Sequence, residues 1–209
     1  SPMTLQTWWL FVTALFLIAA TPGPNMLHVM VQSIHHGTRR SIVSMAGLMT
    51  ANLTYLFASA LGLGALLKAS PMLFEALRYA GVAYLVWLGI KAWRAPVADS
   101  GPHAGKPAPP SLRALYATGL GTGFANPKLI VFAGALFPQF LDTSKPFAPQ
   151  LAILVASFIV IETFWYSVYA LGGRSLAAWL APANRQRLFN RITGGIFVAF
   201  GAALFGSRV

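Results

Sequence analysis

Two short proline-containing segments are the first candidates for chemistry in this sequence. One reads Thr21-Pro22-Gly23-Pro24-Asn25 and the other reads Asn126-Pro127-Lys128. A proline has no backbone N–H, so it interrupts helical hydrogen bonding and frees a carbonyl group. A helix that restarts after such a break directs its partially positive end at the break, where an anionic group such as a carboxylate can bind.

The pairing of two breaks favours a binding site over a simple packing kink, although kinks at proline are common in membrane helices. The residues expected to contribute to this site are Pro22, Gly23, Pro24, Asn25, Asn126, Pro127 and Lys128.

Two ionisable residues lie inside long apolar segments. An ionisable group within a membrane is costly and usually faces the interior of the helix bundle. Lys128 is a candidate counter-charge for a substrate carboxylate, or a structural counter-ion. Burial favours the neutral form of a carboxyl group, so Glu162 is a candidate proton carrier. Glu162 could instead bind a substrate ammonium group or pair with Lys128.

Polar and aromatic side chains accompany these groups. Asn52 and Tyr55 lie three residues apart on one helix face, and Trp165 follows Glu162 by three residues. We predict that Asn52, Tyr55 and Trp165 contact a substrate. The alternative is that they serve interhelical hydrogen bonding and packing.

Other chemistry finds little support. The chain has no cysteine and no convincing metal-ligand spacing, and no phosphate-binding Gly-Lys-Ser/Thr loop occurs. We expect His28 to be a hydrogen-bonded core residue, and His35 and His36 to be solvated in a connector. The sequence therefore predicts no enzyme, no cofactor and no metal.

Composition identifies the elements that must position these residues. Of 209 residues, 56% are hydrophobic and only 9% are charged, whereas a soluble domain carries about 25% charged residues. The sequence predicts an all-α integral membrane protein in a lipid bilayer. The net charge of +11 lies mostly between apolar segments, which indicates membrane orientation and no nucleic-acid partner.

Six apolar segments are long enough, or nearly so, to cross a bilayer about 30 Å thick. They span residues 8–31, 41–67, 73–90, 114–141, 146–173 and 192–207. The first has no basic flank or cleavage site, so we expect a span and not a removable signal peptide. The prolines should break the first and fourth helices. The basic stretch 174–191 could form an interfacial amphipathic helix.

A flexible cytoplasmic linker at 94–113, rich in proline and glycine, divides the chain. The halves, 1–93 and 114–209, each hold three predicted helices. An odd number of spans means that the halves enter the membrane from opposite sides, as two inverted repeats. Glycines such as Gly119, Gly123 and Gly194 allow close helix approach, within the chain or across a possible homodimer.

Loop charges set the expected orientation. With the N-terminus outside, the inner loops hold Arg39, Arg40, Lys91, Arg94, Lys106, Arg113, Arg174, Arg185, Arg187 and Arg191. The outer side holds Lys68, Arg78, Lys145 and Arg208. Cytoplasmic loops carry the excess of Lys and Arg, so we predict that both termini are periplasmic.

Several motifs together resemble one known family. They are Ala20-Thr21-Pro22-Gly23-Pro24-Asn25, His36-Gly37-Thr38-Arg39-Arg40, the run Arg78 to Gly89, and Asn126-Pro127-Lys128 with Phe137-Pro138-Gln139-Phe140. In this combination the chain resembles the lysine exporter (LysE/RhtB) family of bacterial inner-membrane amino-acid exporters. Residues 15–95 and 118–141 carry most of the resemblance.

The resemblance implies efflux of amino acids, driven by the proton motive force, with the two proline motifs important. Members handle basic, neutral and hydroxylated amino acids. Because Glu162 is the only acid deep in a predicted span, we favour a neutral substrate such as threonine, homoserine or leucine, moved by alternating access. The alternative is a passive channel or facilitator for amino acids or small metabolites.

Overall fold

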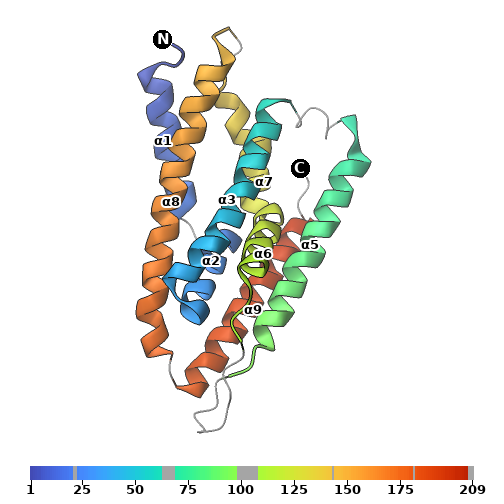
Figure 1. Ribbon diagram of the computed structural model, residues 1–209. Coiled ribbons are helices and arrows are strands. Elements are labelled where there is room, and N and C mark those ends of the chain that lie inside the picture. Colours follow the sequence, from blue (N-terminus) through green and yellow to red (C-terminus); the bar gives the residue numbers. More distant parts are fainter. Residues whose placement is uncertain (21–22, 63–68, 98–107, 143, 181, 207–209) are drawn as a thin grey trace.

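The computed structural model describes residues 1–20, 23–62, 69–97, 108–142, 144–180 and 182–206 (Figure 1). Across these residues the chain is helical, and no strand occurs among them. The prediction of an all-α chain is therefore confirmed.

The first apolar segment is broken where its prolines predict. α1 spans Leu5–Ala20 and α2 spans Pro24–His36, and the two helices are bent by 52° relative to each other. Thr21 and Pro22 lie outside the described residues.

The connector after α2 is shorter than expected. His35 and His36 form the last turn of α2, so their assignment to a connector was wrong. Gly37 alone separates α2 from α3 (Thr38–Ala60). Its φ of 80° lies in the left-handed region, which glycine adopts without a side-chain penalty, and the chain can therefore reverse within one residue.

The second proline segment also breaks its helix. α6 spans Leu112–Phe124 and α7 starts again at Pro127, spanning Pro127–Val131. A π-helical turn, η1 (Phe132–Leu136), and a 3-10 turn, η2 (Phe137–Phe140), follow. Pro138 lies in η2 and donates no backbone hydrogen bond, so regular α-helix does not continue through it.

The remaining helices are longer than their apolar segments. α5 spans Pro71–Trp93, α8 spans Phe147–Trp179 and α9 spans Ala183–Gly206. The predicted interfacial helix at 174–191 was wrong, because the ends of α8 and α9 occupy this stretch. α9 begins directly after Pro182, whose carbonyl accepts from the backbone N–H of Arg185 and Gln186.

The helices form one bundle with two distinct ends (Figure 1). The N-terminus, the end of α3 and the starts of α5 and α8 lie at one end. The end of α5, the start of α6 and the turn from α8 to α9 lie at the other. α3 packs against α6, α5 packs against α9, and α8 packs against α2 and α1.

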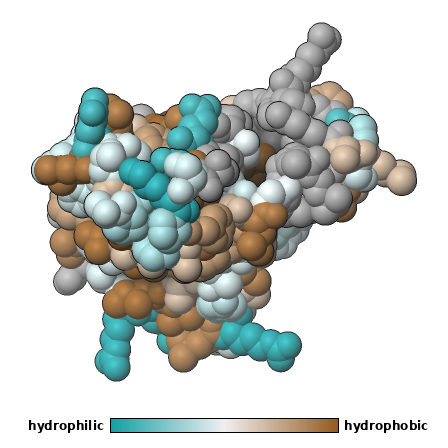
Figure 2. Space-filling view, turned by 90° about the horizontal axis from the view of Figure 1, so that it is seen from above, coloured by the Kyte–Doolittle hydropathy of each residue, from teal (hydrophilic) through white to brown (hydrophobic). Residues whose placement is uncertain are grey.

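The bundle has the character of a membrane protein. Among the described residues, α3 and the Phe147–Gly173 part of α8 are long and apolar enough to cross a bilayer, and α1 with α2 passes as a third, broken span. The other three predicted spans stay predictions. Large apolar side chains such as Leu17 and Val160 are exposed, as expected of a surface that faces lipid. Seen from above, hydrophobic residues reach the edges of the end face (Figure 2).

Glycines let pairs of helices approach closely inside the chain. A Cβ atom on Gly47 of α3 would lie 2.2 Å from the carbonyl oxygen of Tyr116, and one on Gly119 of α6 would lie 2.2 Å from that of Ser44. In the same way, Gly89 of α5 and Gly194 of α9 each face the other's carbonyl oxygen. The predicted close approach through these glycines therefore occurs within one chain.

We expect Gly47→Ala and Gly119→Ala to destabilise the protein, because the added methyl group collides with backbone. Overpacking costs about 1–3 kcal/mol, which for a chain of this size lowers Tm by roughly 2–10 °C. Thermal unfolding in detergent measures the shift. Gly172→Ala in α8 is the matched control, since its Cβ atom meets nothing within 4 Å. Equal melting of all three variants would contradict the packing argument.

Candidate functional site at the two helix breaks

The first break leaves two carbonyl groups that a helix would normally satisfy. The N–H groups of residues 22 and 24 would bond the carbonyls of Ile18 and Ala20, but both residues are prolines. Gly23 is extended, with φ of −153° and ψ of 178°, and Pro24 opens α2. Within a membrane such freed carbonyls need other donors.

Two side chains from distant helices supply these donors. The Lys128 ammonium group of α7 donates to the Ile18 carbonyl at 3.0 Å, and the Tyr169 hydroxyl of α8 donates to the Ala20 carbonyl at 2.9 Å. Lys128 also packs on the break itself, since a Cβ atom on Gly23 would lie 3.3 Å from Lys128 Cε. Lys128 is therefore tied to the end of α1.

The second break is completed in the same manner. Asn126 caps α7, with its Oδ1 accepting from the Lys128 backbone N–H at 3.0 Å. That N–H is then not donated to the Phe124 carbonyl, which instead accepts from the Tyr55 hydroxyl of α3 at 2.6 Å. One turn further, the Ser59 hydroxyl donates to the Ala133 carbonyl in η1. Tyr55 and Ser59 thus join α3 to the broken fourth segment.

A buried hydrogen-bond network joins three helices behind the first break. Asn25 Nδ2 of α2 donates to Asn52 Oδ1 of α3 at 3.0 Å and to the Tyr166 hydroxyl of α8 at 3.3 Å. Asn52 Nδ2 donates to the same hydroxyl at 2.8 Å. Because Tyr166 accepts from both amides, its own proton is left for the neighbouring carboxyl group of Glu162. The network therefore ends at Glu162.

A small cavity lies where these groups meet. Its polar lining consists of Asn25, Asn52, Asn126, Lys128 and Glu162. Its volume of about 20 Å³ holds on the order of one water molecule. Asn25 Oδ1 is buried without a hydrogen-bond partner, and Glu162 is only 7% exposed. The site can offer a cation, a carboxyl group and amides, but it must widen to admit an amino acid.

The structure brings together only part of the predicted site. Asn25, Asn52, Asn126, Lys128 and Glu162 line the cavity, with Gly23, Pro24 and Pro127 beside it at the helix starts. Tyr55 and Trp165 are not in its lining. Tyr55 supports the second break, and Trp165 packs on Phe16 with ring centroids 5.1 Å apart. Pro22 lies outside the described residues.

The predicted site did not include Tyr166 and Tyr169. Both lie on the Glu162 face of α8, at the fourth and seventh residues after it. That spacing was visible in the sequence, but their partners, Asn25, Asn52 and the Ala20 carbonyl, are set by packing between helices.

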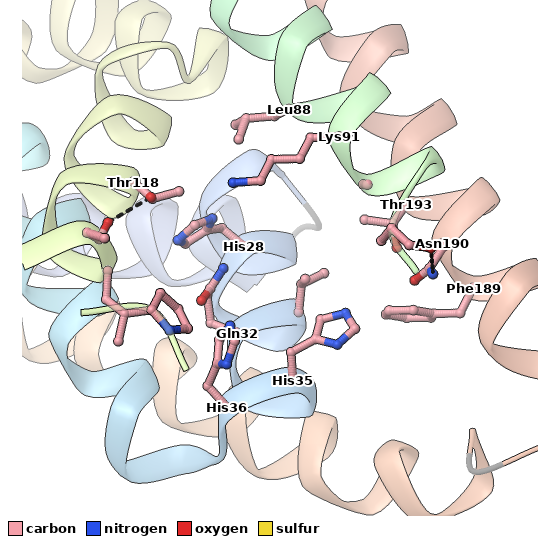
Figure 3. Close-up of a pocket in the computed structure, with 16 residues that line it drawn as sticks. His28, Gln32, His35, His36, Leu88, Lys91, Thr118, Phe189, Asn190 and Thr193 are labelled. Carbon is pink, nitrogen blue, oxygen red and sulfur yellow. Dashed lines mark hydrogen bonds between the residues drawn. The ribbon is translucent and has the colours of Figure 1, made fainter. Parts of the chain in front are cut away.

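A second, larger pocket opens between α2, α5, α6 and α9, with a volume of about 250 Å³. Figure 3 shows Lys91 reaching from α5 towards His28, with Gln32, His35 and His36 along the same side of α2. Among the described residues, no group of three or more His, Cys, Asp or Glu could hold a metal ion.

The fold and the site are those of a helical membrane protein with a polar cavity at its broken helices. The chain belongs to the LysE type translocator family, whose sequence profile matches residues 16–208.

Curated relatives match over almost the whole chain. The chain is 34% identical over 206 residues to a protein of Salmonella typhimurium named "Homoserine/homoserine lactone efflux protein", covering 99% of both chains. It is 30% identical to a "Leucine efflux protein" of an Enterobacter strain, covering 94% of this chain and 93% of the relative. It is 28% identical to an "Uncharacterized membrane protein" of Vibrio cholerae, covering 97% and 98%. No solved structure matches.

Tyr55→Phe should destabilise the protein, because it leaves the Phe124 carbonyl without its donor. Loss of an intramolecular hydrogen bond costs about 0.5–1.5 kcal/mol, and unfolding in detergent measures the loss. Tyr116→Phe is the control. Its hydroxyl donates to the Thr50 hydroxyl at 2.8 Å, and Thr50 keeps its own hydrogen bond to the Ala46 carbonyl, so the change should cost less than about 0.5 kcal/mol. A similar small loss in both variants would show that the Phe124 carbonyl finds another donor.

Proposed function

We propose that the protein exports amino acids across the bacterial inner membrane by alternating access. The observation that carries this proposal is the cavity at the two breaks, where Lys128 and Glu162 meet three buried asparagines. The names of the homoserine and leucine efflux relatives support the same substrate class.

The lining suits the two ends of a zwitterion. The N-terminus of α2 and the Lys128 ammonium group provide positive charge for the substrate carboxylate. Glu162 and the unpartnered Asn25 Oδ1 provide acceptors for the ammonium group. Because the cavity holds a single carboxyl group beside one lysine, a neutral amino acid fits its charge better than a basic one. Threonine, homoserine and leucine are such substrates.

The size of the cavity supports alternating access over an open pore. A volume of about 20 Å³ is far below the roughly 300 Å³ of a ligand pocket. We infer that the described conformation is closed at this site. The short breaks before α2 and α7 are the places where backbone can change direction during opening.

The order of the helices supports an inverted arrangement of two halves, 1–93 and 114–209, joined by the linker at 94–113. The N-terminus and the start of α8 lie at one end of the bundle, while the end of α5 and the start of α6 lie at the other (Figure 1). Each half carries one helix broken before a proline. The loop charges favour an orientation with the linker in the cytoplasm and both termini in the periplasm. Assembly of two copies as a homodimer is a further part of this proposal.

The cysteine-free sequence makes this topology directly testable. Thr4→Cys, Ala148→Cys and Arg187→Cys each introduce one exposed thiol. In intact spheroplasts a membrane-impermeant maleimide should label the first two, and Arg187→Cys should react only after permeabilisation. Labelling of Thr4→Cys and Ala148→Cys from opposite sides would contradict the arrangement.

Glu162 is the proposed proton carrier, since it ends the network from Asn25, Asn52 and Tyr166 and shares the cavity with Lys128. Efflux of labelled L-homoserine or L-leucine from proteoliposomes should rise several-fold when a proton gradient is imposed. Glu162→Gln keeps the shape and removes the titratable group, so its efflux should not respond to the gradient. Unchanged gradient dependence in this variant would remove Glu162 from the mechanism.

Asp142→Asn is the matched control for that experiment. Asp142 is exposed in the loop before α8, and the hydroxyl and backbone N–H of Ser144 hold the pKa of this carboxyl below its usual value. It therefore stays ionised during the assay, and its loss should leave the gradient dependence intact. Wild-type efflux that ignores the gradient would favour the alternative, a passive facilitator.

A further inference from the structure

The larger pocket, at the end of the bundle where α5 meets α6, has the features of a second binding site. It contains on the order of ten times the volume of the central cavity, at about 250 Å³ against 20 Å³. Two buried acceptor atoms at the pocket, His28 Nε2 and Gln32 Oε1, have no hydrogen-bond partner. His28 itself is 3% exposed. A buried polar atom normally has a partner, so these atoms point to a ligand.

The hydrogen bonds around His28 assign its ring as an acceptor. The Thr122 hydroxyl donates its proton to the Thr118 carbonyl at 2.8 Å. It can then only accept from His28 Nδ1, which lies 3.4 Å away. The imidazole therefore carries its proton on Nδ1 and presents the lone pair of Nε2 to the pocket. Gln32 Oε1 lies one helical turn further along α2.

Lys91 supplies the opposite charge. Its ammonium group extends from α5 towards His28 (Figure 3) and lies 5.0 Å from the centre of the Trp87 ring. No Asp or Glu occurs among the described residues that line the pocket. A substrate carboxylate would therefore meet the Lys91 ammonium group without repulsion from a described lining carboxylate. The neutral acceptors His28 Nε2 and Gln32 Oε1 can accept from a substrate ammonium group.

We propose that this pocket binds the zwitterionic amino acid before it reaches the central cavity, with Lys91 holding the carboxylate and His28 and Gln32 accepting from the ammonium group. This inference rests on the proposed export function and extends it to a second site on the linker side. His28 follows Asn25 by three residues on α2, so one helix links the two sites. The described lining residues hold no carboxylate, which disfavours amino acids with a second positive charge.

Protection from thiol labelling tests the site without relying on transport. Ala92→Cys places a single thiol in the pocket lining. L-Homoserine should slow its reaction with a maleimide. L-Homoserine lactone, which lacks the carboxylate, should require a concentration about tenfold higher or more, because a charge-assisted hydrogen bond is lost. A thiol at Gly172, exposed and outside the lining, should react equally with and without either compound.

The charge at position 91 should decide the preference. In the Ala92→Cys background, Lys91→Met should remove the advantage of homoserine over its lactone, and Lys91→Arg should retain it. Lys145→Met, outside the pocket, should change nothing. In inside-out vesicles Lys91→Met should also raise the half-saturating homoserine concentration about tenfold.

The outcomes separate the two proposals. Protection with Lys91 dependence but no transport of any amino acid would keep the pocket and overturn the export function. Transport without protection, or protection that ignores Lys91→Met, would keep the exporter and overturn the second site.

Discussion

The constraint on which this structure depends is the demand of the membrane interior that every backbone carbonyl find a donor. Prolines in the first and fourth helical segments remove such donors. The missing hydrogen bonds are replaced by side chains from other helices: Lys128 and Tyr169 at the first break, Tyr55 and Ser59 at the second segment. These hydrogen bonds connect helices that are far apart in sequence, and they bring polar side chains together at the breaks. The proposed substrate site consists of these polar side chains.

The same polar groups serve structure and proposed function together. Asn25, Asn52 and Tyr166 fix three helices against one another, and they also lead to Glu162. Close glycine contacts add rigidity away from the breaks, where α3 meets α6 and α5 meets α9. The bundle thus combines closely packed helix pairs with two breaks where side chains from other helices replace backbone hydrogen bonds. Such points are where we expect movement during transport.

The sequence predicted the elements better than the contacts. Proline chemistry located both breaks, because a missing N–H acts whatever the surroundings. Apolar runs located the helices but missed their ends: α8 and α9 continue into the polar stretch 174–191, since a helix can extend beyond the lipid until a residue such as Pro182 stops it. Asn25, Asn52 and Glu162 were found as polar residues in apolar surroundings. Tyr55 and Trp165 share that pattern but lie outside the cavity, because helix rotation and tilt, not residue type, decide what a side chain faces.

The position of Lys128 has a mechanical consequence. Its ammonium group joins the two halves, because it extends from α7 and donates to the Ile18 carbonyl near the end of α1. A substrate carboxylate bound at the proposed site would compete with the Ile18 carbonyl for this ammonium group, so binding would weaken the contact between α7 and the end of α1. Substrate binding would then favour the conformational change. A protein without substrate would rarely make that change, which would limit the leak of ions through it.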